Sequence, residues 1–176
     1  MTTISVRPRT LGDREGLLKA LASCARHSGY FAAEDGSLVS HAEASLFDDR
    51  YDAAWVAEVD GVVLGHIAVM PLPLAEDQES IPLWTAATGR SAEAHTLIKR
   101  LFVDPQAQGG GIARALMATA MAHLAAAGQI GVLDTVSVAQ PAMKLYQGLG
   151  WREIGRTKPS WTDEPFDMVL FVAPGH

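Results

Sequence analysis

Three consecutive glycines, Gly109 to Gly111, stand between a β-prone segment and a strongly helical one, and this arrangement limits the fold more than any other feature. The β-prone residues Leu101 to Val103 are followed by Asp104-Pro105, which ends a strand because proline lacks a backbone N–H and disfavours helical geometry before it. From Ile112 to Leu124, apolar residues recur with a 3.6-residue period. This pattern predicts an amphipathic helix, with the glycines in the loop at its N-terminus.

Such a loop can bind an anion. The first N–H groups of a helix have no intrahelical partner, the helix dipole adds positive charge, and glycine lets an anion approach the backbone. We interpret the glycines as a pyrophosphate-binding loop. A Walker loop is excluded because Ile112-Ala113 replaces its lysine and hydroxyl residue, and a dinucleotide fingerprint is excluded by Arg114 at its last position. A flexible linker is the alternative, which the attached turn and helix disfavour.

Length and composition limit the class of protein. The chain has 176 residues, of which 48% are hydrophobic, which predicts a single domain over residues 1–176. The net charge of −6 argues against nucleic acid as a partner. The only cysteine, Cys24, is expected to be a buried structural thiol, and the histidine spacing predicts no metal site. Without a signal peptide or a membrane-length apolar run, we expect no membrane association and a cytoplasmic location.

The remaining pattern predicts a mixed α/β chain. Asp60-Gly61 is a strong hairpin signal between strands at Ala53 to Val59 and Val62 to Met70. Further strands are expected at 4–7, 131–138, 151–157 and 166–172, and helices at 11–27, 41–49 and 141–149. Leu74 to Glu93 is the least regular segment, and we expect this long connection to be functional or loosely ordered.

A second motif, Pro141 to Trp151 (PAMKLYQGLGW), completes a resemblance to a known family. It resembles the A-x-x-L-Y-x-x-x-G-[FW] segment of the GCN5-related N-acetyltransferases (GNAT), and Gln108 to Ala113 resembles their [Q/R]-x-x-G-x-[G/A] acyl-CoA loop. The resemblance is close from Thr96 to Arg156. It implies an α/β (α+β) fold with a central mixed, mostly antiparallel sheet of about seven strands flanked by helices. Two parallel strands in this fold are splayed, and the element order is β-α-α-β-β-β-α-β-α-β-β.

The resemblance also implies acetyl-CoA as cosubstrate and a set of site residues. Leu101, Phe102 and Val103 would contact the pantetheine, and the Val103 amide would polarise the thioester carbonyl. The other implied contacts are Gln108, Gly109, Gly110, Gly111, Ile112, Ala113, Arg114, Ala139, Ala142 and Tyr146. Tyr146 would protonate the departing thiolate, since phenol and thiol pKa values are similar. The alternative is that Tyr146 only packs beside Leu145 and Leu149.

The implied activity is N-acetylation of a primary amine, with a small molecule as the expected acceptor, by direct attack in a ternary complex. Two departures keep a catalytically degenerate acyl-CoA sensor or interaction module as the alternative: Ala139 replaces a common asparagine, and Leu97 replaces a glutamate base. Glu93, His95 and His66 are candidate bases, beside a water chain. A homodimer is common in the family.

Acidic segments are expected to border the acceptor site and to suit a cationic amine. They are residues 48–49, 76–79 and 163–164. The aromatic residues that could wall the same site are Tyr30, Phe31, Trp84 and Trp161.

Overall fold

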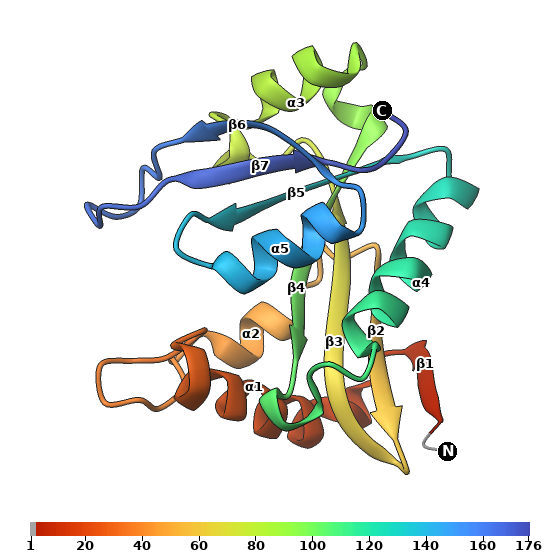
Figure 1. The fold of residues 1–176 in the computed structure, drawn as a ribbon, viewed down its shortest axis with the longest axis vertical. Helices are drawn as coiled ribbons and strands as arrows, with labels where there is room; N and C mark the ends of the chain where they lie inside the picture. Colours follow the sequence, from red (N-terminus) through yellow and green to blue (C-terminus); the bar gives the residue numbers. More distant parts are fainter. Residues whose placement is uncertain (1–2) are drawn as a thin grey trace. The chain divides into compact units, whose positions relative to one another are not determined.

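Seven strands form one mixed sheet, in the order β1-β2-β3-β4-β5-β7-β6, in a computed structural model that describes residues 3–176 (Figure 1). The strands are β1 (Ile4–Pro8), β2 (Ala53–Val59), β3 (Val62–Pro71), β4 (His95–Val103), β5 (Ile130–Val136), β6 (Arg152–Thr157) and β7 (Met168–Val172). The helices are α1 (Arg14–Ser28), α2 (Ala42–Leu46), α3 (Ile81–Thr88), α4 (Ile112–Ala126) and α5 (Gln140–Gly148). Four one-turn 3-10 helices are η1 (Leu11–Asp13), η2 (Ala75–Asp77), η3 (Ala92–Ala94) and η4 (Pro105–Ala107). The predicted seven-stranded, mostly antiparallel sheet with flanking helices is confirmed.

The described chain divides into two compact units. The first comprises the residues up to Met70 together with Ile98–His123, and the second comprises Pro71–Leu97 and Leu124–His176. Strand β4 contributes residues to both units. The prediction of a single domain over residues 1–176 stays a prediction. In the described range 3–176, no helix combines the length and the apolar character that crossing a membrane requires.

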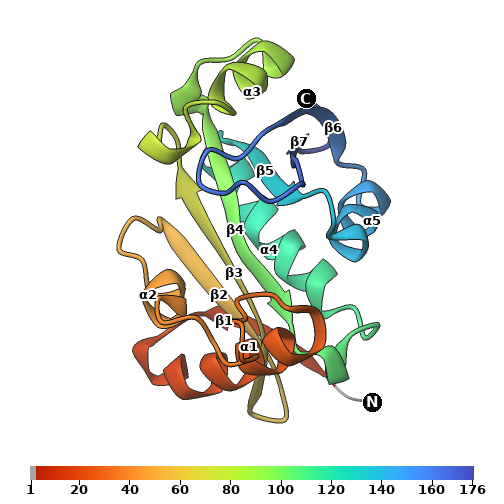
Figure 2. The same ribbon diagram turned by 90° about the vertical axis from the view of Figure 1, so that its left-hand side faces the viewer.

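The first unit packs two helices against antiparallel strands. Strands β1, β2 and β3 pair in sequence, and β2 carries a bulge at Ala57 and Glu58. Figure 2 shows α1 and α2 beside one another against these strands. The apolar face of α1 fills the core because its buried residues recur every three or four positions. The core of this unit contains Leu17, Ala20, Leu21, Cys24, Ala42, Leu46, Val56 and Phe102.

The second unit is built on strands β5, β7 and β6, which lie side by side in Figure 1 and pair antiparallel. The start of β4 adds a parallel ladder of three residue pairs, from His95 with Ile130 to Leu97 with Val132. The core of this unit contains Leu72, Trp84, Leu97, Ile130, Val132, Leu170 and Val172. The parallel ladder uses only the first three residues of the nine-residue strand β4.

Helix α3 corrects the expected element order, which placed no helix between Leu74 and Glu93. Pro82 lies in its first turn, and Gly89 follows its end with a φ of 67°. This combination of an early proline and a terminal glycine is a helix signal that the sequence interpretation missed. Trp84 is fully buried in the core. The expectation that Trp84 walls an acceptor site is therefore wrong.

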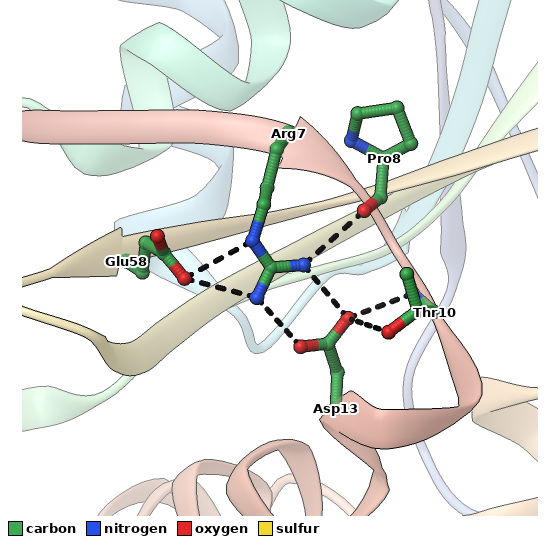
Figure 3. A network of polar contacts seen from close by, with 5 residues as sticks. All are labelled: Arg7, Pro8, Thr10, Asp13 and Glu58. Atoms are coloured by element: carbon green, nitrogen blue, oxygen red, sulfur yellow. Dashed lines mark hydrogen bonds and ion pairs between the residues drawn. The ribbon is translucent and has the colours of Figure 1, made fainter.

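Arg7 joins β1, β2 and η1 through its guanidinium group (Figure 3). Its Nη2 donates to Asp13 Oδ1 at 2.7 Å and to Glu58 Oε2 at 2.9 Å, and its Nη1 donates to Asp13 Oδ2 at 2.9 Å. Asp13 Oδ2 also accepts from the Thr10 amide at 2.7 Å. The hydrogen bonds from Arg7 lower the pKa of Asp13 to about 2, against the opposing effect of burial. This carboxylate thus fixes the entry into α1.

We expect Asp13 to make the protein sensitive to acid. Because its pKa is lower in the folded protein than its ordinary value of 3.8, its stabilisation is complete above that value and is lost as the pH falls towards 2. Its size is on the order of 2 kcal/mol. Denaturant unfolding should show Asp13→Asn less stable than wild type at pH 6, with the difference shrinking below pH 4. A difference that stays constant down to pH 2.5 would contradict this assignment.

Candidate functional site

The glycine run forms an open turn between η4 and α4. Asp104 is the N-cap residue of η4, and its carboxylate accepts a hydrogen bond from the Gln106 amide at 3.0 Å. Beyond it, Gly109 and Gly111 have φ values of 84° and 86°. Residues with a Cβ adopt this region only at a cost of about 1–2 kcal/mol. Among the atoms of residues 3–176, a Cβ at either glycine would meet none within 4 Å except those of its chain neighbours, so the space beside these two glycines is open.

Backbone donors line this turn. The Ala115 amide donates to the Gly111 carbonyl oxygen at 3.0 Å, which begins the hydrogen-bond ladder of α4. Within residues 3–176, the N–H groups of residues 109–114 donate to no backbone oxygen. Six successive amides near the positive end of a 15-residue helix form a suitable cradle for a diphosphate.

Gly65 on β3 lets α4 approach the sheet closely. A Cβ at this position would lie 3.0 Å from Leu116 Cδ1, 3.1 Å from Ile112 Cγ2 and 3.1 Å from the Phe102 carbonyl oxygen. A larger residue would therefore push the first turns of α4 away from β3 and β4. The position of the glycine turn thus depends on a glycine far away in the sequence.

Two side chains donate hydrogen bonds to the carbonyl oxygen of Val103 at the end of β4. Cys24 Sγ donates to it at 3.4 Å and Gln108 Nε2 at 3.3 Å. Burial raises the pKa of the Cys24 thiol to about 11, and its expected role as a buried structural thiol is confirmed. Gln108 links the loop to the strand. The catalytic role predicted for Val103 concerns its N–H and stays a prediction.

Strand β4 contains a residue in an unusual conformation immediately before Leu101. Arg100 has a φ of 54°, which is rare for a residue other than glycine. His66 Nδ1 donates to the Arg100 carbonyl oxygen at 2.9 Å, and the ring of His66 stacks on Phe102 with 5.6 Å between centroids. Such conformations persist where the surrounding structure fixes them, and they cluster at functional sites.

The candidate bases are mostly structural. His66 is fully buried, and burial lowers its pKa to about 4, so it is a poor proton acceptor near neutral pH. His95 is also fully buried, with Nδ1 donating to the Ser91 carbonyl oxygen at 2.8 Å and Nε2 2.8 Å from Thr88 Oγ1. Glu93 is exposed, and a hydrogen bond from its own amide lowers its pKa below the ordinary value for a glutamate. This shift weakens Glu93 as a base.

Helix α5 holds the second motif in the second unit. Tyr146 is 8% exposed, and its ring packs against Phe171 and Trp151 at centroid distances of 5.7 and 6.4 Å. Ala139 occupies the N-cap position of the helix without a side-chain hydrogen bond, and Ala142 lies half-buried in its first turn. The tyrosine ring is therefore buried between α5 and the residues that pack against it.

The second unit also contains an acidic hollow. Its lining residues are Glu76, Asp77, Glu79, Ser80, Asp134, Thr157, Lys158, Pro159, Ser160, Trp161 and Met168. The structure thus brings the acidic segment 76–79 together with Trp161 and adds Asp134 from β5, and the expected role of these residues beside an acceptor stays a prediction. Carboxylates beside an aromatic ring suit an ammonium group. Among residues 3–176, no three His, Cys, Asp or Glu side chains are grouped to hold a metal ion.

Comparison with known proteins identifies the family. A sequence profile described as the acetyltransferase (GNAT) family matches residues 26–151, a range that contains both the glycine turn and Tyr146. The chain belongs to the GNAT acetyltransferase family. The resemblance of the two motifs to this family is therefore confirmed.

Relatives agree with this membership. The chain is 31% identical over 125 residues to an N-acetylaspartate synthetase of Danio rerio, covering 66% of this chain and 37% of that protein. It is 29% identical over 114 residues to N-acetyltransferase 8 of Homo sapiens, covering 64% of this chain and 44% of that protein. The chain thus spans less than half the length of these curated relatives.

A solved GNAT structure supports the fold. The family acetyltransferase of Brucella melitensis, determined in complex with acetyl-CoA, superimposes with a TM-score of 0.61 at 21% identity. The match covers 99% of this chain and 90% of that chain. At this identity the similarity shows the fold alone.

The residues predicted from the GNAT motifs fall into two groups. Leu101, Phe102, Val103 and residues 108–114 lie together in the first unit, on β4, the glycine turn and α4. Ala139, Ala142 and Tyr146 lie together in the second unit, on or next to α5. The sequence interpretation missed Arg100 and Asp134, because no local pattern distinguishes them from ordinary strand residues.

Proposed function

We propose that the protein transfers the acetyl group of acetyl-CoA to a primary amine by direct attack in a ternary complex. The open glycine turn carries this proposal, because within residues 3–176 its amides have no backbone acceptor and the space beside Gly109 and Gly111 is open. Residues 108–114 would hold the diphosphate, and Leu101 to Val103 would align the pantetheine along β4. Acetyl-CoA would supply the activated thioester, and the protein would contribute mainly positioning.

The proposed roles of individual residues follow the order of bond changes. The lone pair of the neutral amine forms the new C–N bond, and the Val103 N–H stabilises the negative charge that develops on the carbonyl oxygen. As the C–S bond breaks, Tyr146 donates its proton to the departing thiolate. The amine nitrogen loses one proton to water, and water returns one proton to the Tyr146 phenolate, so the net products are the acetamide and free CoA. Leu97, which is apolar and fully buried, takes no part in proton transfer.

A small-molecule amine is the proposed acceptor. The name of the Danio rerio relative, N-acetylaspartate synthetase, refers to an acetylated small molecule. The acidic hollow with Trp161 offers a suitable environment for an ammonium group. The predictions of a cytoplasmic location and of a homodimer stay predictions.

Two measurements on the purified protein test the proposed function. CoA should raise the free energy of unfolding by about 2.7 kcal/mol at a concentration a hundredfold above its Kd. Acetyl-CoA with a panel of amines should then release free thiol for at least one acceptor. Stabilisation without thiol release for any amine would instead support a CoA sensor, and the absence of stabilisation would exclude an acyl-CoA site.

A further inference from the structure

Arg9, just after β1, and Arg100, on β4, bring their guanidinium groups to the same end of α2. Arg9 Nη1 donates to the carbonyl oxygen of Leu46, the last residue of the helix. Arg100 Nε donates to Ser45 Oγ at 2.6 Å. Because Ser45 and Leu46 are adjacent, two positive charges from distant parts of the sequence are held near one another. Both charges also help to lower the pKa of His66, for which burial is the main cause.

In the described part of the chain, neither arginine forms an ion pair with an acidic side chain. Asp13 and Asp48, whose charges reach these arginines, are hydrogen-bonded to other arginines. Both guanidinium-bearing residues are half-buried, and burial lowers the pKa of Arg9. Holding two like charges close is unfavourable when the carboxylates within reach are bonded to other arginines, and an anion bound directly to the pair would offset that cost.

The guanidinium group of each arginine lies over an aromatic ring. Arg9 Cζ lies 4.5 Å from the centroid of the Phe47 ring, and Arg100 Cζ lies 4.9 Å from that of Phe31. A guanidinium group stacked on a ring keeps its N–H donors at its edge, where they can bind the two oxygens of a carboxylate. The rings also limit the positions that each side chain can adopt. The pair is therefore preorganised for a flat anion.

The position of Arg100 relates this pair to the acyl group. It directly precedes Leu101 to Val103, the residues predicted to contact the pantetheine, and His66 fixes its backbone carbonyl. Three residues span at most about 11 Å of chain, so an anion at Arg100 would lie within a small molecule's length of the Val103 amide. An amine bearing its own carboxylate could bind there and still reach the thioester.

We propose that Arg9 and Arg100 bind a carboxylate of the acceptor, which makes the acceptor an amino acid rather than a simple amine. The inference rests on the proposed acetyltransferase function and narrows its substrate class. It also changes the expectation of a purely cationic acceptor, since an amino acid carries both charges. Arg9 and Arg100 would then determine specificity.

Matched acceptors test the proposal. We expect aspartate, glutamate and phenylalanine, taken as a set, to include a substrate whose kcat/KM exceeds that of its α-carboxamide by about 10- to 100-fold, as for a charge-assisted bidentate contact. Arg9→Gln and Arg100→Gln should abolish this preference. Arg100→Lys keeps the charge but loses the planar fork, so an intermediate preference is expected. Arg26→Gln, on an exposed part of α1, is the control and should behave as wild type.

The affinity for CoA, measured by calorimetry, separates this proposal from the proposed function. If the Arg9 and Arg100 variants keep their CoA affinity but lose the preference for the carboxylate, the result would support the carboxylate-binding proposal. A matching loss of CoA affinity would mean that the arginines bind a CoA phosphate, and would overturn it. Acetylation with no preference between acids and amides would also overturn it, while leaving the acetyltransferase function intact.

A binding measurement tests the pair even if no amine is acetylated. The arginine Nε–Hε signals in a 1H–15N spectrum, assigned from the two glutamine variants, should shift when aspartate or succinate is added to the wild-type protein. The absence of any shift at tens of millimolar ligand would overturn the proposal. A shift with no turnover would place the failure in the proposed catalytic function instead.

Discussion

Tyr146→Phe should lower kcat by about one to three orders of magnitude while weakening the affinity for CoA by at most about tenfold, the loss of one hydrogen bond. The expectation follows from the proposed role of the hydroxyl group, since proton transfer from a positioned acid contributes about 10²- to 10⁴-fold in typical enzymes. The substitution keeps the aromatic ring, which packs against Phe171 and Trp151. Steady-state kinetics with the best acceptor from the amine panel gives kcat, and calorimetry gives the CoA affinity.

Trp151→Phe provides a matched control for the packing around Tyr146. Trp151 is 4% exposed, so replacing its indole by the smaller phenyl ring should lower the free energy of unfolding by about 1–3 kcal/mol. The Tyr146 hydroxyl remains in this variant, so kcat should change by only a few-fold. If both variants lost the same activity, the effect would reflect packing of α5. Unchanged turnover in Tyr146→Phe would remove the tyrosine from the mechanism.

Gly111→Ala should weaken CoA binding by about ten- to a hundredfold. The φ of Gly111 is 86°, and alanine there costs about 1–2 kcal/mol in the geometry that aims the loop amides. The chain can relieve this strain by turning the peptide groups next to residue 111. That change would misdirect the donors proposed to bind the diphosphate, because hydrogen bonds weaken steeply with angle. Calorimetric titration with CoA measures the effect.

Gly29→Ala controls for the strain alone. Gly29 ends α1 with a φ of 77°, and a Cβ there would also meet no atom beyond its chain neighbours within 4 Å. The two variants should therefore lose similar stability, and only Gly111→Ala should lose CoA affinity. Equal CoA affinities in the two variants would show that the glycine turn is not the diphosphate site.

Local features of the chain were predictable from sequence. The Asp60-Gly61 hairpin, the glycine turn and the amphipathic helix after it each depend on residues that are neighbours in the chain. The helix at Ile81 was missed, although Pro82 and Gly89 marked its ends, because the acidic and apolar residues around it show no clear period. Strand β5 ends at Val136 rather than at the predicted residue 138, since its pairing with β7 stops there.

By itself, the sequence determined the two motifs, the order of all but one of the main elements and the family resemblance. Glycine conformations and helix periodicity are set within a few residues, so pattern analysis can find them. Only the tertiary structure decided that Gly65 lets α4 approach the sheet, that His66 is buried and neutral, and that Arg9 and Arg100 both bond to the last residues of α2. Desolvation and ion pairing depend on which distant segments pack together, and no local pattern encodes that information.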